Sequence, residues 1–152
     1  MQLKDAKSFP KFTKYVSTAI PTLGNVDSIV SAISSISELG DASVIKDALS
    51  WGKGPVIDIQ ILVDKQIGNK VYSPRAGYTP HTNIIVMRQK DVAYFEMGSD
   101  MRKAPNGHMV HIVGVQLLHE LVHWARDRAG KDETEDLGFV FEKQIYGGIV
   151  TD

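Results

Sequence analysis

Two histidines and a glutamate in the last third of the chain have the types and spacing of a metal-dependent hydrolytic site. The segment His119-Glu120-Leu121-Val122-His123 has the pattern H-E-x-x-H. Residues four apart lie one above the other on a helix, with Cβ atoms about 5–6 Å apart, so His119 and His123 could bind one zinc ion. Glu120 lies about 100° further around such a helix and could act as a general base on a zinc-activated water. A chain of this composition contains the pattern by chance only about 0.006 times.

A catalytic zinc site takes three protein ligands, and three acidic candidates follow the motif: Glu133, Glu135 and Glu142. If the helix that carries the motif turns over at residues 130–132 and the next helix returns antiparallel, His119 faces Glu142. In that arrangement Glu135 is offset from the two histidines by about 7 Å along the helix. We therefore expect Glu142 to be the third ligand, with Glu135 as the alternative. Glu142 could instead keep its carboxylate in water at the rim of the site.

Neighbouring residues fit supporting roles. Gly138, one turn before Glu142, would let the two helices approach closely. Tyr146, one turn after Glu142 on the same face, is our candidate catalytic donor to the oxyanion of the tetrahedral intermediate. A packed aromatic ring with a surface hydroxyl is an equal alternative for Tyr146. Asp132 and Thr134 fit helix caps.

The hydrophobic pattern around the motif predicts an α+β fold of helices and a small, antiparallel sheet. The first third is mostly helical, the middle is strand-rich, and the motif lies on the longest helix, which an antiparallel helix follows. Helices are expected at residues 26–39, 44–49, 109–129 and 133–146, and strands at residues 56–63, 83–87 and 92–95, with a further short segment at residues 70–72.

Length and composition restrict the classes of protein that this chain can belong to. Its 152 residues fit one domain, with a helical part at 1–50, a strand-rich part at 54–96 and the helix pair at 108–148. A net charge of -1 provides no general basic field for nucleic acid. No apolar run is long enough for a membrane span, and residues 1–21 lack the apolar core of a classical signal peptide. If the protein leaves its cell, another route must carry it.

The absence of cysteine excludes thiolate nucleophiles and cysteine-bound zinc, so any metal must be held by His, Asp or Glu. The other three histidines, His81, His108 and His111, fit ordinary structural roles first. His81, in a turn before a predicted strand, could also belong to a substrate-binding rim.

The motif, together with Gly138-Phe139-Val140-Phe141-Glu142 and the following Tyr146-Gly147, resembles a zincin of the gluzincin type. It is similar to the metallopeptidase toxin domains of bacterial polymorphic and secreted effector toxins. The resemblance covers about the last 45 residues and departs from the best-known gluzincins at Tyr146, where they carry an acidic residue.

This resemblance implies a zinc-dependent endopeptidase that holds an extended protein or peptide substrate on an edge strand. It also implies delivery into a target cell and neutralisation by an immunity protein in the producer. Two alternatives remain open at the level of sequence. One is a non-catalytic binding module with a structural zinc ion, and the other is an intracellular housekeeping metalloprotease.

Overall fold

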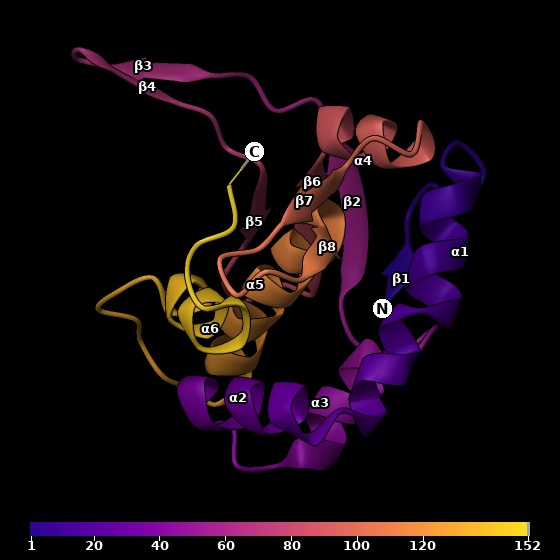
Figure 1. Cartoon of the computed structure of the whole chain (residues 1–152). Helices are drawn as coiled ribbons and strands as arrows, with labels where there is room; N and C mark the ends of the chain where they lie inside the picture. The colour runs from indigo at the N-terminus through magenta and orange to yellow at the C-terminus, as the bar shows by residue number, and fades with distance from the viewer. Residues whose placement is uncertain (152) are drawn as a thin grey trace.

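The computed structural model of the protein describes residues 1–151 (Figure 1). The helices are α1 (Pro10–Thr18), the 3₁₀ helix η1 (Ile20–Asn25), α2 (Asp27–Ser37), α3 (Ala42–Leu49), α4 (Gln89–Glu96), α5 (Ile112–Arg128) and α6 (Leu137–Tyr146). The strands are β1 (Gln2–Leu3), β2 (Val56–Gln60), β3 (Lys65–Ile67), β4 (Lys70–Tyr72), β5 (Ala76–Tyr78), β6 (Ile84–Arg88), β7 (Met101–Lys103) and β8 (Met109–His111).

Four strands form the main sheet in the order β1-β2-β6-β5. The strands β1, β2 and β6 run parallel to one another, whereas β5 is antiparallel to β6 and lies at one edge of the sheet. Ile57 of β2 is paired with Ile85 of β6, and both side chains are fully buried. This pair places the sheet's inner face against the core. The remaining strands form two separate hairpins, β3-β4 and β7-β8.

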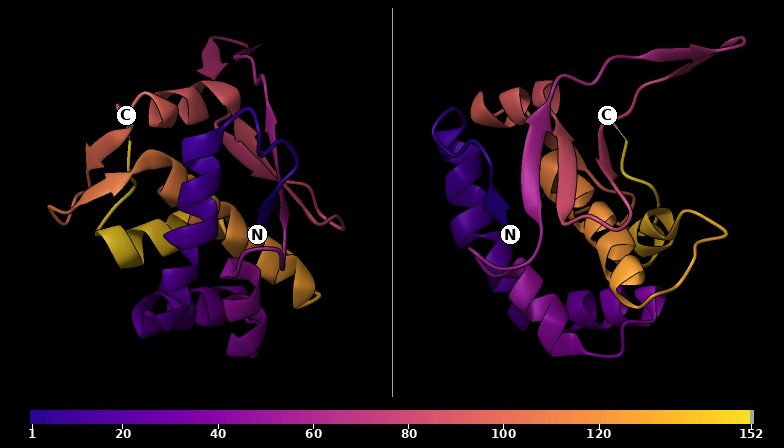
Figure 2. Two further views of the ribbon diagram at one scale, coloured as in Figure 1. Left: turned by 90° about the vertical axis from the view of Figure 1, so that its right-hand side faces the viewer. Right: turned by 180° about the vertical axis from the view of Figure 1, so that it is seen from behind.

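The long helix α5 occupies the centre of the fold (Figure 2). It packs against β5 and β6 of the sheet and also against the helices α2 and α6. Most of its residues are therefore buried, including Leu117, Leu121 and Val122. A helix enclosed in this way is held along its whole length, so the side chains that it presents to a cavity have fixed positions.

The ends of the two C-terminal helices follow from local chemistry. Gly130 follows α5 with a φ of 67°, in the left-handed region that favours glycine. Asp136 caps the start of α6, where its side chain accepts a hydrogen bond from the backbone N–H of Phe139 at 3.2 Å. Gly147 ends α6 with a φ of 78°. These caps fix the short connection, residues 129–136, that joins the two helices.

The predicted α+β class is confirmed, as are the helical first third and the pair of helices at the C-terminus. The expectation of an antiparallel sheet is wrong for β1, β2 and β6. The predicted strand at residues 92–95 is also wrong, because these residues belong to α4. Val92 and Phe95 lie three positions apart and both contact the core, which suits a helix face.

The other differences concern short elements and boundaries. The helix expected to start at residue 133 starts at Leu137, and residues 109–111 form β8 before α5 begins. The short segment at residues 70–72 is the strand β4, but its partner β3 and the edge strand β5 were not predicted. Each of these strands has three residues, too few to show a clear alternation of apolar and polar positions.

No single helix among residues 1–151 is long and apolar enough to cross a membrane. The helices α2 and α3 reach the required length and hydropathy only when they are counted together, across a bend of 117°.

Candidate metal centre

The side chains of the H-E-x-x-H motif line a cavity of about 720 Å³ beside α5. The edge strand β5 forms one wall of this cavity. The connection between α5 and α6, the first turns of α6 and residues 149–151 form the other side. His119, Glu120 and His123 all face the cavity from α5, as their helical spacing requires.

Asp136 brings a carboxylate oxygen to the same ring nitrogen of both histidines. Its Oδ1 lies 3.2 Å from Nε2 of His119 and 3.4 Å from Nε2 of His123. The candidate ligand atoms of the three residues all lie within 4.8 Å of one another. The N-terminus of α6 thus supplies an anionic oxygen opposite the two imidazoles of α5.

This donor set fits a divalent cation. Two ligands of a tetrahedral zinc ion, each about 2.0–2.1 Å from the metal, lie about 3.3 Å from one another. The observed separations between Asp136 and the histidines are 3.2 and 3.4 Å. Two imidazole nitrogens and one carboxylate oxygen also match the ligand types of catalytic zinc sites.

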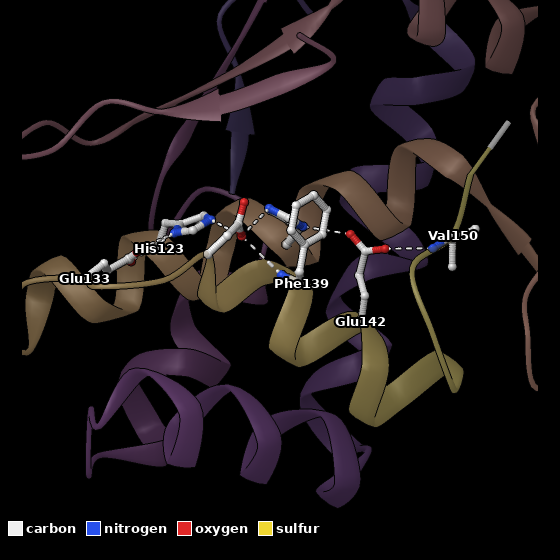
Figure 3. A network of polar contacts seen from close by, with 7 residues as sticks. His123, Glu133, Phe139, Glu142 and Val150 are labelled. Carbon is white, nitrogen blue, oxygen red and sulfur yellow. Dashed lines mark hydrogen bonds and ion pairs between the residues drawn. The ribbon is translucent and has the colours of Figure 1, made fainter. Parts of the chain in front are cut away.

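The second ring nitrogen of each histidine contacts a different carboxylate (Figure 3). Nδ1 of His119 lies 2.7 Å from Oε1 of Glu142, whose Oε2 accepts the backbone N–H of Val150 at 2.8 Å. Nδ1 of His123 lies 2.7 and 2.9 Å from the two oxygens of Glu133. Carboxylates in these positions hold Nδ1 protonated, which directs the lone pair of Nε2 toward the cluster.

The electrostatics of the centre favour positive charge. Burial opposes the charged form of His119, but the carboxylates of Asp136 and Glu142 outweigh it and raise the pKa of His119 to about 10. Burial likewise disfavours the ionised form of Asp136, yet its contacts with His119 and His123 hold its pKa well below the usual range. A site that holds protons this firmly has a strongly negative potential, which also attracts a metal cation.

Glu120 is 7 % exposed and faces the cavity next to the two histidines. Burial raises the pKa of Glu120, and the nearby imidazoles of His119 and His123 only partly offset that effect. A raised pKa makes the carboxylate a stronger proton acceptor. Glu120 is therefore a candidate general base.

Gly138 allows α6 to approach α5 at the level of the first histidine. A Cβ atom built on Gly138 would collide with the imidazole ring of His119. The ring of Phe139 meets the same imidazole edge to face, with centroids 4.9 Å apart. The His119 ring is thus enclosed by α6, as the close approach expected from Gly138 requires.

A clamp from α5 holds the turn that follows β5. Oδ2 of Asp127 accepts hydrogen bonds from the hydroxyl of Tyr78 at 2.6 Å and from the backbone N–H of His81 at 2.9 Å. His81 has a φ of 61°, in a backbone region that residues other than glycine rarely adopt. The edge strand is therefore fixed relative to the motif by a residue one turn after His123.

The structure brings some of the predicted site residues to the expected positions and others to different ones. It brings His119, Glu120 and His123 to one cavity, and Glu142 lies close to His119 as the hairpin argument required. Glu142, however, contacts Nδ1 of His119, and Asp136 lies where we expected Glu142, beside the two Nε2 atoms. The reason is that α6 begins at Leu137, so the residue that caps it reaches the cluster first.

Glu135 and Tyr146 do not line the cavity. Glu135 is exposed on the connection between the helices. Tyr146 is half-buried and packs against Phe141, with ring centroids 6.2 Å apart. Burial raises the pKa of the Tyr146 hydroxyl, as do the nearby Tyr15 and Glu142. The structure does not bring this hydroxyl to the cluster.

Sequence reasoning missed Asp136. The signal was present, because an Asp before the apolar run Leu-Gly-Phe-Val-Phe is a typical helix cap. Placing the start of the helix at residue 133 hid this signal inside the expected helix. Correct placement of the cap would have put Asp136 at the mouth of the helix pair.

The fold and the cluster together define a small α+β domain with a candidate metal-dependent hydrolytic centre on its longest helix. A family model described as metallopeptidase toxin 3 matches residues 5–147. The chain therefore belongs to the metallopeptidase toxin 3 family. No curated protein and no solved structure matched the chain.

Membership in this family identifies the class of activity. Its members are described as metallopeptidases, which hydrolyse peptide bonds in proteins with the help of a metal ion, and as toxins. The cluster of His119, His123 and Asp136 is the place among residues 1–151 that fits the required metal.

Proposed function

We propose that this protein is a zinc-dependent peptidase whose metal ligands are His119, His123 and Asp136 and whose general base is Glu120. The observation that carries the proposal is the meeting of Asp136 Oδ1 with both Nε2 atoms, at 3.2 and 3.4 Å, beside a buried glutamate in an open cavity. Glu142, our expected ligand, and Glu133 then orient the two imidazoles.

Bound zinc supplies Lewis acidity, which lowers the pKa of water and polarises a peptide carbonyl. Glu120 accepts the proton of the attacking water and delivers it to the departing amine. Burial of Glu120 suits this double task, because its raised pKa lets it keep the proton between the two steps.

The substrate of this proposed peptidase is a protein segment in extended conformation. Among the strands of residues 1–151, β5 pairs only with β6, and it lines the cavity, so one of its edges faces no other strand. An extended peptide can add to such an edge as a further strand. The Asp127 clamp keeps this edge in place beside Glu120.

The first experiment compares metal content and proteolysis in three variants. Glu120→Gln should keep about one zinc ion per chain and lose cleavage, because it removes the base and none of the proposed ligands. Asp136→Ala should lose most of the zinc and all of the cleavage. Glu135→Ala, a neighbouring exposed carboxylate, is the matched control and should resemble the wild type.

Three outcomes would contradict the proposal. Cleavage by purified Glu120→Gln at the wild-type rate would exclude Glu120 as the base. Full zinc content in Asp136→Ala, with loss of zinc in Glu142→Ala, would restore Glu142 as the third ligand. Zinc without any cleavage by the wild type would favour the structural-zinc alternative, in which the ion only joins α5 and α6.

We further propose that the protein acts as a delivered effector toxin and that an immunity protein protects the producing cell. The toxin description of the family supports this biological role. Expression of the wild type in a host cell should then arrest growth, and expression of Glu120→Gln should not. Equal growth of both strains would favour a housekeeping protease.

A further inference from the structure

The hairpin β3-β4 and its flanks carry an unusual concentration of exposed apolar side chains. Within residues 61–72, five large apolar side chains are 65–79 % exposed: Ile61, Val63, Ile67, Val71 and Tyr72. Single exposed apolar residues are common on protein surfaces, whereas several on one short segment favour an interaction site. This part of the chain therefore needs an explanation beyond folding.

The register of the hairpin gives one of its faces a mixed apolar and cationic character. Lys65 is paired with Tyr72, and Ile67 is paired with Lys70. Residues directly opposite in a hairpin, and those two positions along, point to the same side. One face thus presents two lysines together with an isoleucine and a tyrosine, and no acidic residue.

This hairpin projects away from the rest of the molecule in Figures 1 and 2. Its two strands pair with each other and with none of the other strands in residues 1–151. An isolated hairpin of two short strands is at most marginally stable in water, and unpaired strand edges invite another chain. Its geometry is that of a binding element rather than of a structural one.

The hairpin is continuous with the wall of the candidate active site. From Tyr72 the chain passes through Ser73 and Arg75 directly into β5. A second cavity of about 420 Å³ lies at the base of the hairpin, and Ser73 and Arg75 line this cavity as well as the larger one. A polypeptide bound along β5 therefore reaches the hairpin if it continues past Ser73 and Arg75, which line both cavities.

Charge divides between the two ends of this path. The hairpin and its base carry the lysines Lys65, Lys70 and Lys90 against the single acidic residue Asp64. The opposite side of the active-site cavity carries Asp132, Glu133 and Asp136 against one lysine, Lys131. A partner that fits the hairpin end must combine negative charge with apolar side chains.

We propose that the hairpin is a substrate-docking site that binds an acidic, apolar segment of the polypeptide substrate next to the segment held along β5. This inference rests on the proposed peptidase function and extends it from the cleavage site to substrate selection. Docking outside the cleft would select a protein by a segment distant from the bond that is cut, without a contribution to the chemical step.

Binding rather than cleavage tests this proposal. The protein is Glu120→Gln, and the probe is a fluorescein-labelled 16-residue peptide in which Asp and Glu alternate with Leu and Tyr. A second probe has Lys in place of every acidic residue. Fluorescence anisotropy should show that the acidic probe binds about tenfold or more tightly than the basic one.

Charge reversal on the hairpin should remove this preference. Adding Lys65→Glu and Lys70→Glu should weaken the acidic probe about tenfold and leave zinc content unchanged. The matched control adds Lys7→Glu and Lys14→Glu, two exposed lysines in the N-terminal region, which produce the same change in net charge. Tyr72→Ser should weaken binding of the acidic probe without any change in charge.

Equal affinity of the hairpin variant and the control variant for the acidic probe would overturn the proposal. Binding to vesicles of phosphatidylcholine and phosphatidylserine, lost in the hairpin variant and not accompanied by peptide binding, would assign the hairpin to a membrane surface instead. A dimer in sedimentation that the hairpin variant abolishes would assign it to a second copy of the chain. Probe binding requires no proteolysis, so a failure of the peptidase proposal would be seen separately, as absent cleavage by the wild type.

Discussion

His119 and His123 lie one turn apart on α5, and each places Nδ1 2.7 Å from a carboxylate oxygen. The two carboxylates belong to different parts of the molecule. Glu142 is 4 % exposed within α6, and its other oxygen is bound by the backbone of Val150. Glu133 lies on the connection between the helices, and its side chain is 27 % exposed.

The two proposed metal-binding histidines are therefore oriented by carboxylates in different settings. The His119 side is built into the packing of two helices, where both oxygens of the Glu142 carboxylate have partners. The His123 side depends on a connection whose carboxylate can exchange its partner for water at little cost. We expect the two sides to contribute unequally to metal affinity and to stability.

The largest effect should come from Glu142→Ala. It leaves Nδ1 of His119 and the N–H of Val150 without partners in a buried setting, which costs about 1–3 kcal/mol in the free energy of unfolding. Zinc affinity should fall about 10–100-fold, because the imidazole is no longer oriented. Urea denaturation and titration with a zinc-buffered indicator measure the two effects. Retention of both values would show that the two sides are equivalent.

Gly138→Ala tests the close packing of α6 on the His119 ring. The new Cβ would collide with the His119 ring, so the ring or α6 must move, at a cost of about 1–3 kcal/mol. Thermal unfolding of the zinc-loaded protein should reveal this loss. Gly40→Ala is the matched control, because no atom lies within 4 Å of its added Cβ. An equal change in both variants would contradict the close packing of Gly138 on the ring.

The free energy of unfolding of the metal-free protein should depend on pH because the carboxylates around His119 raise its pKa. The folded state raises the pKa of His119 from 6.5 to about 10, so the proton stabilises the fold below pH 6.5, and this contribution is lost as the pH rises to about 10. Burial lowers the pKa of the Met1 amino group to about 5, which has the opposite effect below pH 8.

The informative window is therefore pH 8–10. In EDTA the free energy of unfolding should fall across this window, and in excess zinc the fall should be smaller, because the metal replaces the proton. Glu142→Gln should flatten the slope in EDTA, since it removes one of the carboxylates that raise the pKa of His119. A slope that is unchanged in Glu142→Gln would assign the effect elsewhere.

The smallest effect should come from Glu133→Ala. Water can replace its carboxylate at Nδ1 of His123, so zinc affinity should fall by less than about tenfold and stability should change by less than about 0.5 kcal/mol. Calorimetric zinc titration measures the affinity, with Glu135→Ala on the same connection as the control. A loss as large as that of Glu142→Ala would remove the proposed difference between the two sides.

Sequence reasoning succeeded where the relation between residues is local. Four-residue spacing places His119 and His123 on one stripe, and a short connection between two helices brings Glu142 to His119. Neither result depends on the rest of the fold. The partner of each ring nitrogen was harder to predict, because it depends on where α6 begins. With α6 starting at Leu137 rather than at residue 133, Asp136 caps the helix and lies at the cluster.

The sheet was less predictable because its pairings join distant parts of the chain. β2 and β6 run parallel only because residues 61–83 leave the sheet, form the projecting hairpin and return through β5. Nothing in the composition of β2 or β6 distinguishes that path from a simple antiparallel turn. β5, which lines the candidate site, has only three residues and includes Gly77.

Asp136 begins a helix with the same oxygen that faces both imidazoles. If Asp136 binds the metal as proposed, the first turn of α6 and the metal centre form one cooperative unit. A cation that fixes the carboxylate then also stabilises the start of the helix, and fraying of that turn removes a ligand. Metal binding and the ordering of residues 136–139 are then coupled, so a change in one changes the other. A scarcity of metal would then loosen the protein first at the entrance to its own cleft.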